Sequence, residues 1–391
     1  MNASLLLAMA NATNLSPRQE QDIYDTAHQC ANTVVRVSPL NAFVANYRGY
    51  ISFAKLKNGP ISWSLESTQG GYRLFKGVEP PLYGKSSSSG LFCSNVSING
   101  TLEEVIEHFR IDSTEKAQEL IQRTEDDALD SIKLASLPPP SNSPLETVIV
   151  KWIMGKTAFD GLSRRRDMCA VECDYRFEVN GRRGWVQATK SVKVDSCPDL
   201  EAKMGYVRAE DRGSGHVFIE SDRPGCLQAF HVVNFDIRGN ATEWLAHTCF
   251  RNICAGLRDV DRLLREDRLS RGSWMSPRRY VSQDSVDSCQ RCRSTFGLFR
   301  KKTNCQKCGK VVCSSCNLLW KVKVNEQVTK MNACGVCSLK PPRKAKKVDD
   351  DTDNAPWLSE SFLSHTQTAS ASSYLEIAAG QDTDDGFYYV L

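Results

Sequence analysis

The stretch CQRCRSTFGLFRKKTNCQKCGKVVCSSC, residues 289–316, holds six cysteines in three C-x2-C pairs, and a fourth pair follows within ACGVC at 334 and 337. Two thiolates separated by two residues reach one Zn²⁺ at about 2.3 Å, and four such pairs suffice for two tetrahedral sites. We therefore predict two structural zinc ions, held by Cys289, Cys292, Cys305, Cys308, Cys313, Cys316, Cys334 and Cys337.

The chemistry of this cysteine set argues for folding rather than catalysis. Closed sites of four thiolates leave no position for water or substrate, so no zinc-dependent enzyme is expected. A polar segment of about 60 residues buries too little apolar surface to fold alone, and the metal replaces that core. The other eight cysteines are scattered along the chain, as in a reduced cytosolic protein, so disulfides are the weaker alternative.

The segment over about 280–340 resembles the FYVE zinc finger. Four residues separate Cys308 from Cys313, and Gly309 follows the fourth cysteine, as in that family; RING and PHD fingers use a histidine ligand, which this segment lacks. The resemblance implies an interleaved cross-brace, in which the first and third cysteine pairs share one zinc ion and the second and fourth pairs share the other.

FYVE fingers bind phosphatidylinositol 3-phosphate through a basic strand of pattern R-[RK]-H-H-C-R. Here Lys301 and Lys302 stand at the leading basic positions, with Arg300 just before them. Thr303 and Asn304 replace the paired histidines, and further departures are Gln306, Asn332, Ala333 and Tyr280 at other motif positions. The resemblance therefore makes Arg300, Lys301 and Lys302 the phosphoinositide-binding candidates and leaves much of the stereospecific motif missing.

The preceding FGLF is the candidate membrane-inserting loop. By resemblance, Leu298 and Phe299 enter the bilayer; the alternative is that they cover the first zinc site. Each Lys or Arg near an anionic leaflet adds about 1 kcal/mol of attraction, and Lys307 and Lys310 belong to the same basic group in the sequence.

Charge is unevenly distributed along the 391 residues, whose net charge is +4. Residues 288–347 contain fifteen Lys or Arg and one acid, whereas 348–391 contain nine Asp or Glu and no Lys or Arg. We expect an anionic membrane surface as the partner of the basic module, no nucleic acid, and a disordered acidic tail. No apolar run reaches the roughly 18 residues of a membrane span, and SLLLAMANA, the one candidate export signal, lacks a basic start.

The first 270 residues predict alternating helices and short strands. Ser16-Pro17 opens a helix to about Val35, and TLEEVIEHF and TEDDALDSIKLA are expected to be helical, capped by Thr101 and Thr124. A helix from about 241 to 269 ends the region, with Asn240 and Glu243 in capping-box positions. The expected strands are ISWSLESTQG, YRLFKGVE, LFCSNVSI, LETVIVKWIMG, DMCAVECDYRFEVNG, GWVQATKSVKV, GHVFIES and CLQAFHVVNFDIRG. Apolar and polar residues alternate over 171–179, so one side of that strand is expected to be buried and the other to face water.

This order of elements resembles the START lipid-transfer family over residues 16–270. The resemblance implies an α+β helix-grip fold, in which a curved antiparallel sheet encloses the long C-terminal helix around one hydrophobic lipid. It places the tunnel walls on the apolar side of residues 171–179, on VIVKWIM and FHVVNF, and on the apolar stripe of 241–269. A solid core without a ligand is the alternative. Arg176, Glu178 and His231 are candidates to orient a lipid head group, unless they face water or pair across the sheet.

Together these patterns predict a START-like domain over 16–270, a linker over 271–284, a FYVE-type finger over 285–340 and a basic-then-acidic disordered tail over 341–391. The expected function is non-enzymatic lipid binding or transfer in the cytoplasm, with the finger attaching the protein to endosomal membranes that carry phosphatidylinositol 3-phosphate. The alternative is an adaptor whose finger binds a protein such as a small GTPase.

Overall fold

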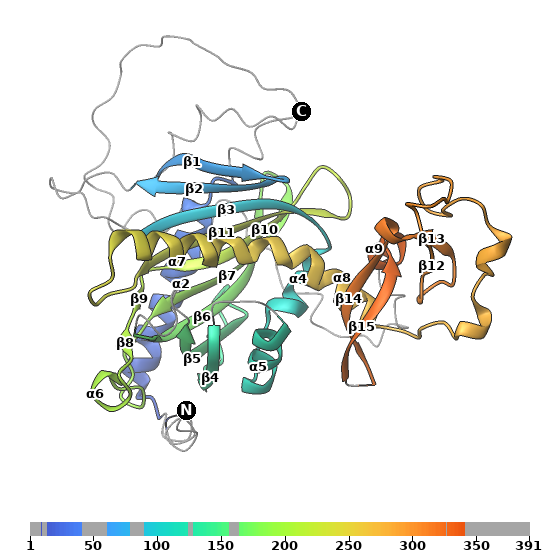
Figure 1. Cartoon of the computed structure of the whole chain (residues 1–391). Coiled ribbons are helices and arrows are strands. Elements are labelled where there is room, and N and C mark those ends of the chain that lie inside the picture. The colour runs from blue at the N-terminus through green and yellow to red at the C-terminus, as the bar shows by residue number, and fades with distance from the viewer. Residues whose placement is uncertain are drawn as a thin grey trace, which may run out of the picture.

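The computed structural model describes residues 9, 14–40, 61–78, 90–123, 128–155, 164–325 and 327–340. Most of the N-terminal apolar stretch, the Thr124 cap and the acidic tail lie outside these residues. A large antiparallel sheet, helices on both of its faces and a small two-hairpin unit at one end make up the described chain (Figure 1). No helix within the described ranges is long and apolar enough to span a membrane.

The large sheet has eleven strands, nine of them in the order β1-β2-β3-β11-β10-β7-β6-β5-β4. The short strand β8 pairs with β6 and β9 pairs with β11. The strands are β1 Ser62–Gln69, β2 Tyr72–Val78, β3 Gly90–Asn99, β4 Ala128–Ser136, β5 Thr147–Gly155, β6 Arg166–Val179, β7 Arg182–Ser191, β8 Val207–Arg208, β9 Glu210–Asp211, β10 Ser214–Glu220 and β11 Cys226–Asp236.

One face of the sheet is covered by the helix α2, Pro17–Val37. Ser16 caps it in a box with Gln19, as the sequence predicted, and its buried stripe includes Ile23, Ala27 and Val34. Cys173 donates to the carbonyl of Ala27, so the apolar side of β6 packs directly against this helix. These contacts form the main hydrophobic core.

The opposite face of the sheet is covered by three further helical segments, two short helices and one long interrupted helix. These are α4 Leu102–Phe109, α5 Thr114–Arg123, α7 Glu243–Ala255, the 3-10 turn η2 Gly256–Asp259 and α8 Val260–Ser270, while the short α6 spans Glu201–Met204. α7, η2 and α8 run one after another across the strands, with α2 behind the sheet (Figure 1). The predicted α+β helix-grip fold is confirmed.

Three predictions about elements are wrong. Most of residues 124–135, expected to be helical, belongs to the strand β4, because pairing with β5 at the sheet edge outweighs helix propensity. The second short helix is instead α5, which begins at Thr114, ten residues before the expected start at Thr124. The long helix is capped by Thr242 rather than Asn240, with Leu245 N–H donating to the Thr242 hydroxyl, and it tightens into η2 at Gly256.

Residues 277–339 form the small unit at the end of α8. It contains the 3-10 turns η3 Pro277–Arg279, η4 Gln283–Ser285 and η5 Ser314–Cys316, the strands β12 Lys302–Asn304, β13 Val311–Cys313, β14 Asn317–Val324 and β15 Gln327–Cys334, and the helix α9 Gly335–Leu339. β12 pairs with β13 and β14 with β15. The buried residues of this unit are mainly cysteines, with Trp320 and a few aliphatic side chains.

Candidate functional site

The cysteines of the small unit gather into two clusters. Cys289, Cys292, Cys313 and Cys316 form one, and Cys305, Cys308, Cys334 and Cys337 form the other; within each, the sulfurs lie within 4.8 Å of one another. A zinc ion about 2.3 Å from four tetrahedral sulfurs requires them to be about 3.8 Å apart. The Cys292–Cys313 and Cys305–Cys337 separations are 3.8 and 3.9 Å. The donor set therefore fits two zinc ions in the interleaved arrangement.

Backbone amides donate to one sulfur of each cluster, three of them in the first cluster and one in the second. Cys289 Sγ accepts from the N–H groups of Arg291, Cys292 and Cys313 at 3.3–3.5 Å, and Cys305 Sγ accepts from Cys334 N–H at 3.2 Å. Such donors stabilise the thiolate, which is the form that binds metal. In the first cluster, the hydroxyl and backbone of Ser294 lower the pKa of Cys292 to about 6.

Gly309 allows the tight turn that follows Cys308 in the second cysteine cluster. It follows Cys308 with φ of +74°, in the left-handed region that glycine favours, and a Cβ there would meet Met275 Sδ at 2.6 Å. Its N–H donates to the Cys305 carbonyl and its carbonyl accepts from Val281 N–H. The glycine therefore closes the metal-binding turn and lets the segment before the finger pack against it.

The finger is docked on the C-terminal end of α8 through backbone groups of β14. Lys321 N–H donates to the Glu266 carboxylate at 2.9 Å, and Lys323 N–H donates to the Ser270 hydroxyl at 2.9 Å. The Glu266 side chain is 2% exposed and also pairs with Arg262. The free edge of β14 is thus satisfied by the helix rather than by another strand.

Lys307 belongs to this docking contact and not to the membrane-facing basic group. Its Nζ donates to the carbonyls of Leu269, Arg271 and Gly272, and it lies 4.6 Å from the centre of the Trp274 ring. Burial lowers its pKa. The sequence-based grouping of Lys307 with the other basic residues is therefore wrong, because its charge is used to satisfy the carbonyls at the end of α8.

Leu298 and Phe299 form the exposed tip of the finger. They occupy a turn in which Arg300 N–H donates to the Gly297 carbonyl at 3.0 Å, and their exposed fractions are 94% and 103%. Neither side chain covers the first zinc cluster, so that alternative is wrong. An apolar pair this exposed is suited to contact with an apolar environment.

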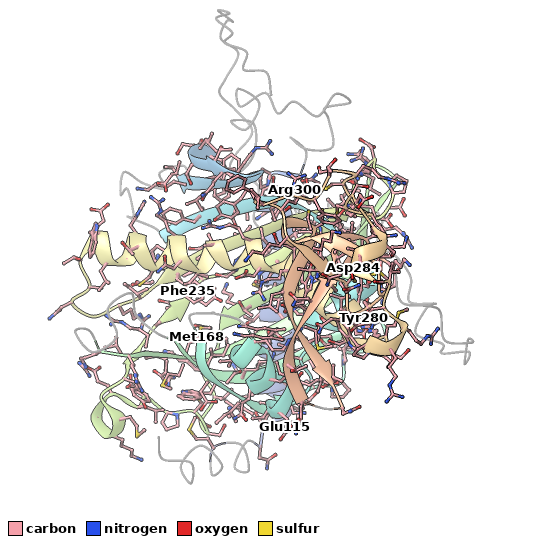
Figure 2. The ribbon with its side chains drawn as sticks, turned by 45° about the vertical axis from the view of Figure 1, so that its right-hand side comes forward. Glu115, Met168, Phe235, Tyr280, Asp284 and Arg300 are labelled. Atoms are coloured by element: carbon pink, nitrogen blue, oxygen red, sulfur yellow. The ribbon has the colours of Figure 1, made fainter. Side chains whose placement is uncertain are left out.

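The basic strand follows directly from this tip. Arg300 and Lys301 are exposed, whereas Lys302 is half-buried and donates to the Gln283 carbonyl at 2.9 Å. Figure 2 shows Arg300 on the finger, together with Tyr280 and Asp284 from the segment that precedes it. The tip and the first two basic residues therefore form one continuous amphipathic edge.

The residues that replace the histidines make internal hydrogen bonds. Thr303 Oγ1 donates to the Val312 carbonyl at 2.9 Å, and Asn304 Nδ2 donates to the Val281 and Gly309 carbonyls at 2.8 and 3.1 Å. Their hydrogen-bonding capacity is directed into the finger, so the cationic side chains carry the attraction for anions at this edge.

A cavity of about 690 Å³ lies between the large sheet and the α7–η2–α8 helix. Its helical wall includes Ile253, Val260 and Leu263, and its sheet wall includes Met168 and Phe235, which lie beneath the long helix in Figure 2. This size is within the ~300–1,000 Å³ typical of ligand pockets. This interface is therefore packed in part, around Leu257, Val260 and Leu264, and hollow in part.

The cavity lies on the other face of β6 from the one predicted. Val171, Cys173 and Tyr175 face α2, whereas Glu172 and Met168 line the cavity. Since successive side chains of a strand point to opposite faces, the apolar side of β6 is committed to the core. Ile153 of β5 and Phe235 of β11 do line it, within two of the expected wall segments.

The expected wet face of β6 is also largely covered. Asp174 is 1% exposed and pairs with Arg110, with Arg110 Nε 3.0 Å from the Asp174 carboxylate. Burial raises the pKa of Asp174 to about 6, although Arg110 opposes that shift. The expectation of a solvated polar side failed because α4 and the residues after it cover this part of the strand.

Of the three head-group candidates, only His231 lines the cavity. Arg176 instead pairs with Glu146 at 2.7 Å, and Glu178 stands opposite Arg183 in the β6–β7 register. His216, which was not among the candidates predicted from the sequence, also lines the cavity. The signal was present, because His216 is a polar residue within the otherwise apolar strand GHVFIES.

Comparison with protein families identifies the small unit, because the family model described as FYVE zinc finger matches residues 279–341. Residues 279–341 form a FYVE zinc finger. The finger binds two zinc ions, and the two four-cysteine clusters are the groups available for them.

A curated relative is similar over a short stretch. The 1-phosphatidylinositol 3-phosphate 5-kinase FAB1 of Saccharomyces cerevisiae is 29% identical over 96 residues, which is 25% of this chain. The chain spans only 4% of the length of that protein.

Solved structures similar to this chain include StAR-related lipid transfer proteins. Human StAR-related lipid transfer protein 5 is 14% identical and covers 61% of this chain and 98% of its own, with a TM-score of 0.38. Human STARD10 is 13% identical, with coverages of 55% and 80% and a TM-score of 0.36. A STAR-related protein fragment from Xanthomonas axonopodis is 16% identical, with coverages of 52% and 98% and a TM-score of 0.36.

Proposed function

We propose that this protein is a non-enzymatic, peripheral membrane protein that holds one lipid in the cavity between sheet and helix and attaches to phosphatidylinositol 3-phosphate membranes of the endosome through its finger. The observation that carries the membrane part is the exposed pair Leu298 and Phe299, on a turn that leads directly into Arg300 and Lys301. In a membrane surface, the apolar side chains can contact the acyl chains while the neighbouring cations contact the anionic head groups.

The specific phosphoinositide is supported by the finger's family and by the name of the yeast relative, which acts on phosphatidylinositol 3-phosphate. We assign the eight clustered cysteines as zinc ligands and Arg300, Lys301 and Lys302 as the phosphate contacts. Zinc in closed thiolate sites supplies rigidity and no reactive position. The small GTPase partner has no supporting observation and stays a prediction.

The cavity supports the lipid-binding part. Its volume is about 690 Å³, and one of its walls is the apolar face of the long helix. The finger is docked on that same helix through Glu266 and Ser270, so membrane attachment brings the cavity close to its lipid source. We divide the chain for this function into a lipid-binding domain over 16–270, a linker over 271–284, a finger over 285–340 and a tail over 341–391.

Liposome flotation with the full chain tests the targeting proposal. Phosphatidylcholine vesicles with phosphatidylinositol 3-phosphate are compared with vesicles that carry the same charge as phosphatidylserine. The proposal expects tighter binding to the phosphoinositide at equal charge. Equal, salt-sensitive binding to both vesicles would remove the specific lipid and leave only general attraction to anionic membranes.

A further inference from the structure

The β14–β15 hairpin of the finger has one edge that the protein covers and one that it leaves open. On the β14 edge, the amides of Lys321 and Lys323 point away from β15, because they donate to side chains of α8. In the register, Lys330 stands opposite Lys321 and Val328 opposite Lys323. Both members of a non-hydrogen-bonded antiparallel pair direct their backbone groups outward. The N–H and C=O groups of Val328 and Lys330 therefore lie on the outer edge of β15.

This outer edge is satisfied at Asn332 but not further along the strand. The Asn332 N–H donates to the Gln306 side chain at 2.6 Å, and the Asn332 carbonyl accepts from Gln306 N–H at 2.9 Å. Among the residues that the structure describes, no partner is found for the backbone groups of Val328 and Lys330. Both residues are exposed, Val328 at 55%. A bare strand edge of this kind is a template for a further strand.

One face of the same hairpin carries positive charge without acidic partners. Lys321 and Lys330 stand directly opposite each other, and like charges so placed repel. Lys323 pairs with Glu119 at 3.2 Å, whereas the described part of the chain shows no salt bridge to Lys321 or Lys330. Leu319, two residues before Lys321, lies on this face and is 58% exposed. The face therefore combines uncompensated positive charge with exposed apolar surface.

The segment DTDDGFYYVL, residues 382–391, has the composition that this edge requires. It contains three aspartates and no Lys or Arg. The aspartates are followed by FYYV, whose aromatic and β-branched residues favour strands. Its strand propensity suits addition to a free edge, and its negative charge suits the two lysines.

The segment is also connected to the chain within reach of this edge. β15 leads directly into α9, and the tail follows α9. A coil of about 40 residues, the length of 341–381, spans roughly 35 Å on average, whereas a strand of eight residues such as β15 is about 27 Å long. Covalent attachment raises the local concentration of the segment to the order of millimolar.

Two other occupants fit the edge less well. A second copy of the chain would bring its own β15 alongside, and the lysines of the two copies would repel one another. An anionic membrane would neutralise the lysines, but it offers no backbone groups in strand register to the amides of Val328 and Lys330. An acidic, strand-forming segment of the same chain meets both requirements.

We propose that residues 382–391 add as a strand to the outer edge of β15, pairing with the backbone of Val328 and Lys330 and bringing aspartates close to Lys321 and Lys330. This contact goes beyond the proposed function, because it requires neither a bound lipid nor a membrane. Its consequence is that the open edge of the finger is closed against edge-to-edge association with other chains.

Hydrogen exchange of single amides, measured by NMR spectroscopy on the full, zinc-loaded chain without lipid, tests the pairing. Docking for about nine-tenths of the time slows exchange of the Val328 and Lys330 amides roughly tenfold. The double variant Tyr388→Pro and Tyr389→Pro is expected to abolish this slowing, because one of two adjacent residues faces β15 in any register and proline has no N–H.

The control for the proline variant is Ser372→Pro with Ser373→Pro, which lies in the tail but outside the segment and should keep wild-type exchange rates. The amides of Thr329 and Met331 face β14 and show whether any variant disturbs the hairpin itself.

Charge reversal tests the contact with the aspartates. Asp384→Lys with Asp385→Lys is expected to accelerate exchange of the Val328 and Lys330 amides, and Glu360→Lys with Glu376→Lys is the matched control. Adding Lys321→Glu and Lys330→Glu to the aspartate variant is expected to restore slow exchange, because opposite charges then face each other again. Unchanged exchange in the aspartate variant would overturn the ionic contact.

The remaining outcomes decide whether the tail is the occupant. Fast exchange of the Val328 and Lys330 amides in the wild type would overturn the proposal. Slow exchange that the double proline variant leaves unchanged would overturn it as well, since another group would then cover the edge. Protection that rises with protein concentration would assign the edge to a second copy, and protection that appears only with anionic vesicles would assign it to a membrane. Either result would overturn docking of the tail.

Discussion

Replacing the exposed tip with alanines is the perturbation that most clearly separates membrane insertion from general electrostatic attraction. The double variant Leu298→Ala and Phe299→Ala removes side chains that are 94% and 103% exposed in the protein alone. Because neither side chain packs against the finger, the free energy of unfolding should change by less than about 0.5 kcal/mol. The zinc content should remain at two ions.

The expected loss in membrane affinity follows from the apolar area. Fully burying a leucine or phenylalanine side chain is worth about 1.5–3 kcal/mol, so half-burial of both is worth about 1.5–3 kcal/mol together. The variant should therefore bind vesicles containing phosphatidylinositol 3-phosphate about ten to a hundred times more weakly. Arg300 and Lys301 remain, so the dependence of binding on salt concentration should be nearly unchanged.

Vesicle sedimentation over a range of lipid concentrations measures the effect. Trp244→Ala is the control, because Trp244 is a large apolar side chain that is 64% exposed on α7, outside the finger. The control should bind vesicles as the wild type does. If the tip variant partitions onto vesicles as strongly as the wild type does, Leu298 and Phe299 do not enter the membrane and the insertion argument is wrong.

Three further predictions concern the zinc centres, the docked interface and the buried histidines. Cys305→Ser should lower the zinc content and increase hydrogen exchange of the amides across Gln327–Cys334, because Cys305 accepts from Cys334 N–H. Exchange of the amides in β6 and β7 should stay slow. Amides of β15 that remain protected in a variant with less zinc would contradict this prediction. Glu266→Ala should accelerate hydrogen exchange of the Lys321 amide roughly 5- to 150-fold, since losing a buried acceptor costs about 1–3 kcal/mol. Glu243→Ala on α7 is the control variant. Equal exchange rates of the Lys321 amide in both variants would rule out the docking role of Glu266. His231 has a folded-state pKa of about 4, below its unfolded value near 6.5, so its stabilising contribution is present above pH 6.5 and is lost as the pH falls to 4. The wild type should thus lose up to about 3 kcal/mol of unfolding free energy relative to His231→Phe over that window, measured by urea denaturation, and parallel pH profiles would refute it.

The parts of the fold that the sequence predicted depend on local signals. The Ser16 cap needs only Pro17 and Gln19 nearby, and the cysteine pairs need only their own spacing to reveal metal sites. The alternation from Val171 to Val179 likewise identifies a strand with one fully apolar side. Each of these features is determined within a few residues, so one sequence is enough to find it.

The parts that failed depend on contacts between distant residues. β4 is a strand because β5 pairs with it, and its own residues carry a helix-compatible pattern. The apolar side of β6 faces α2 rather than the cavity, and alternation alone gives no indication of which helix covers which face.

The cavity and the docked interface likewise depend on contacts between residues that are distant in the sequence. His216 and His231 become neighbours only through the register of β10 and β11, and Gln187 joins them through β7. Glu266 meets the Lys321 amide across 55 residues of chain. Isolated polar residues within apolar strands were the available signal, but their alignment required the sheet topology.

Native mass spectrometry of the intact 43.7 kDa chain, after incubation with phosphatidylcholine vesicles, tests both the zinc sites and the cavity. We expect one dominant species with two zinc ions and one bound lipid, and loss of the lipid on denaturation. A chain that carries two zinc ions but acquires no lipid would contradict the cavity's role, and a folded chain without zinc would contradict the structure proposed for the finger.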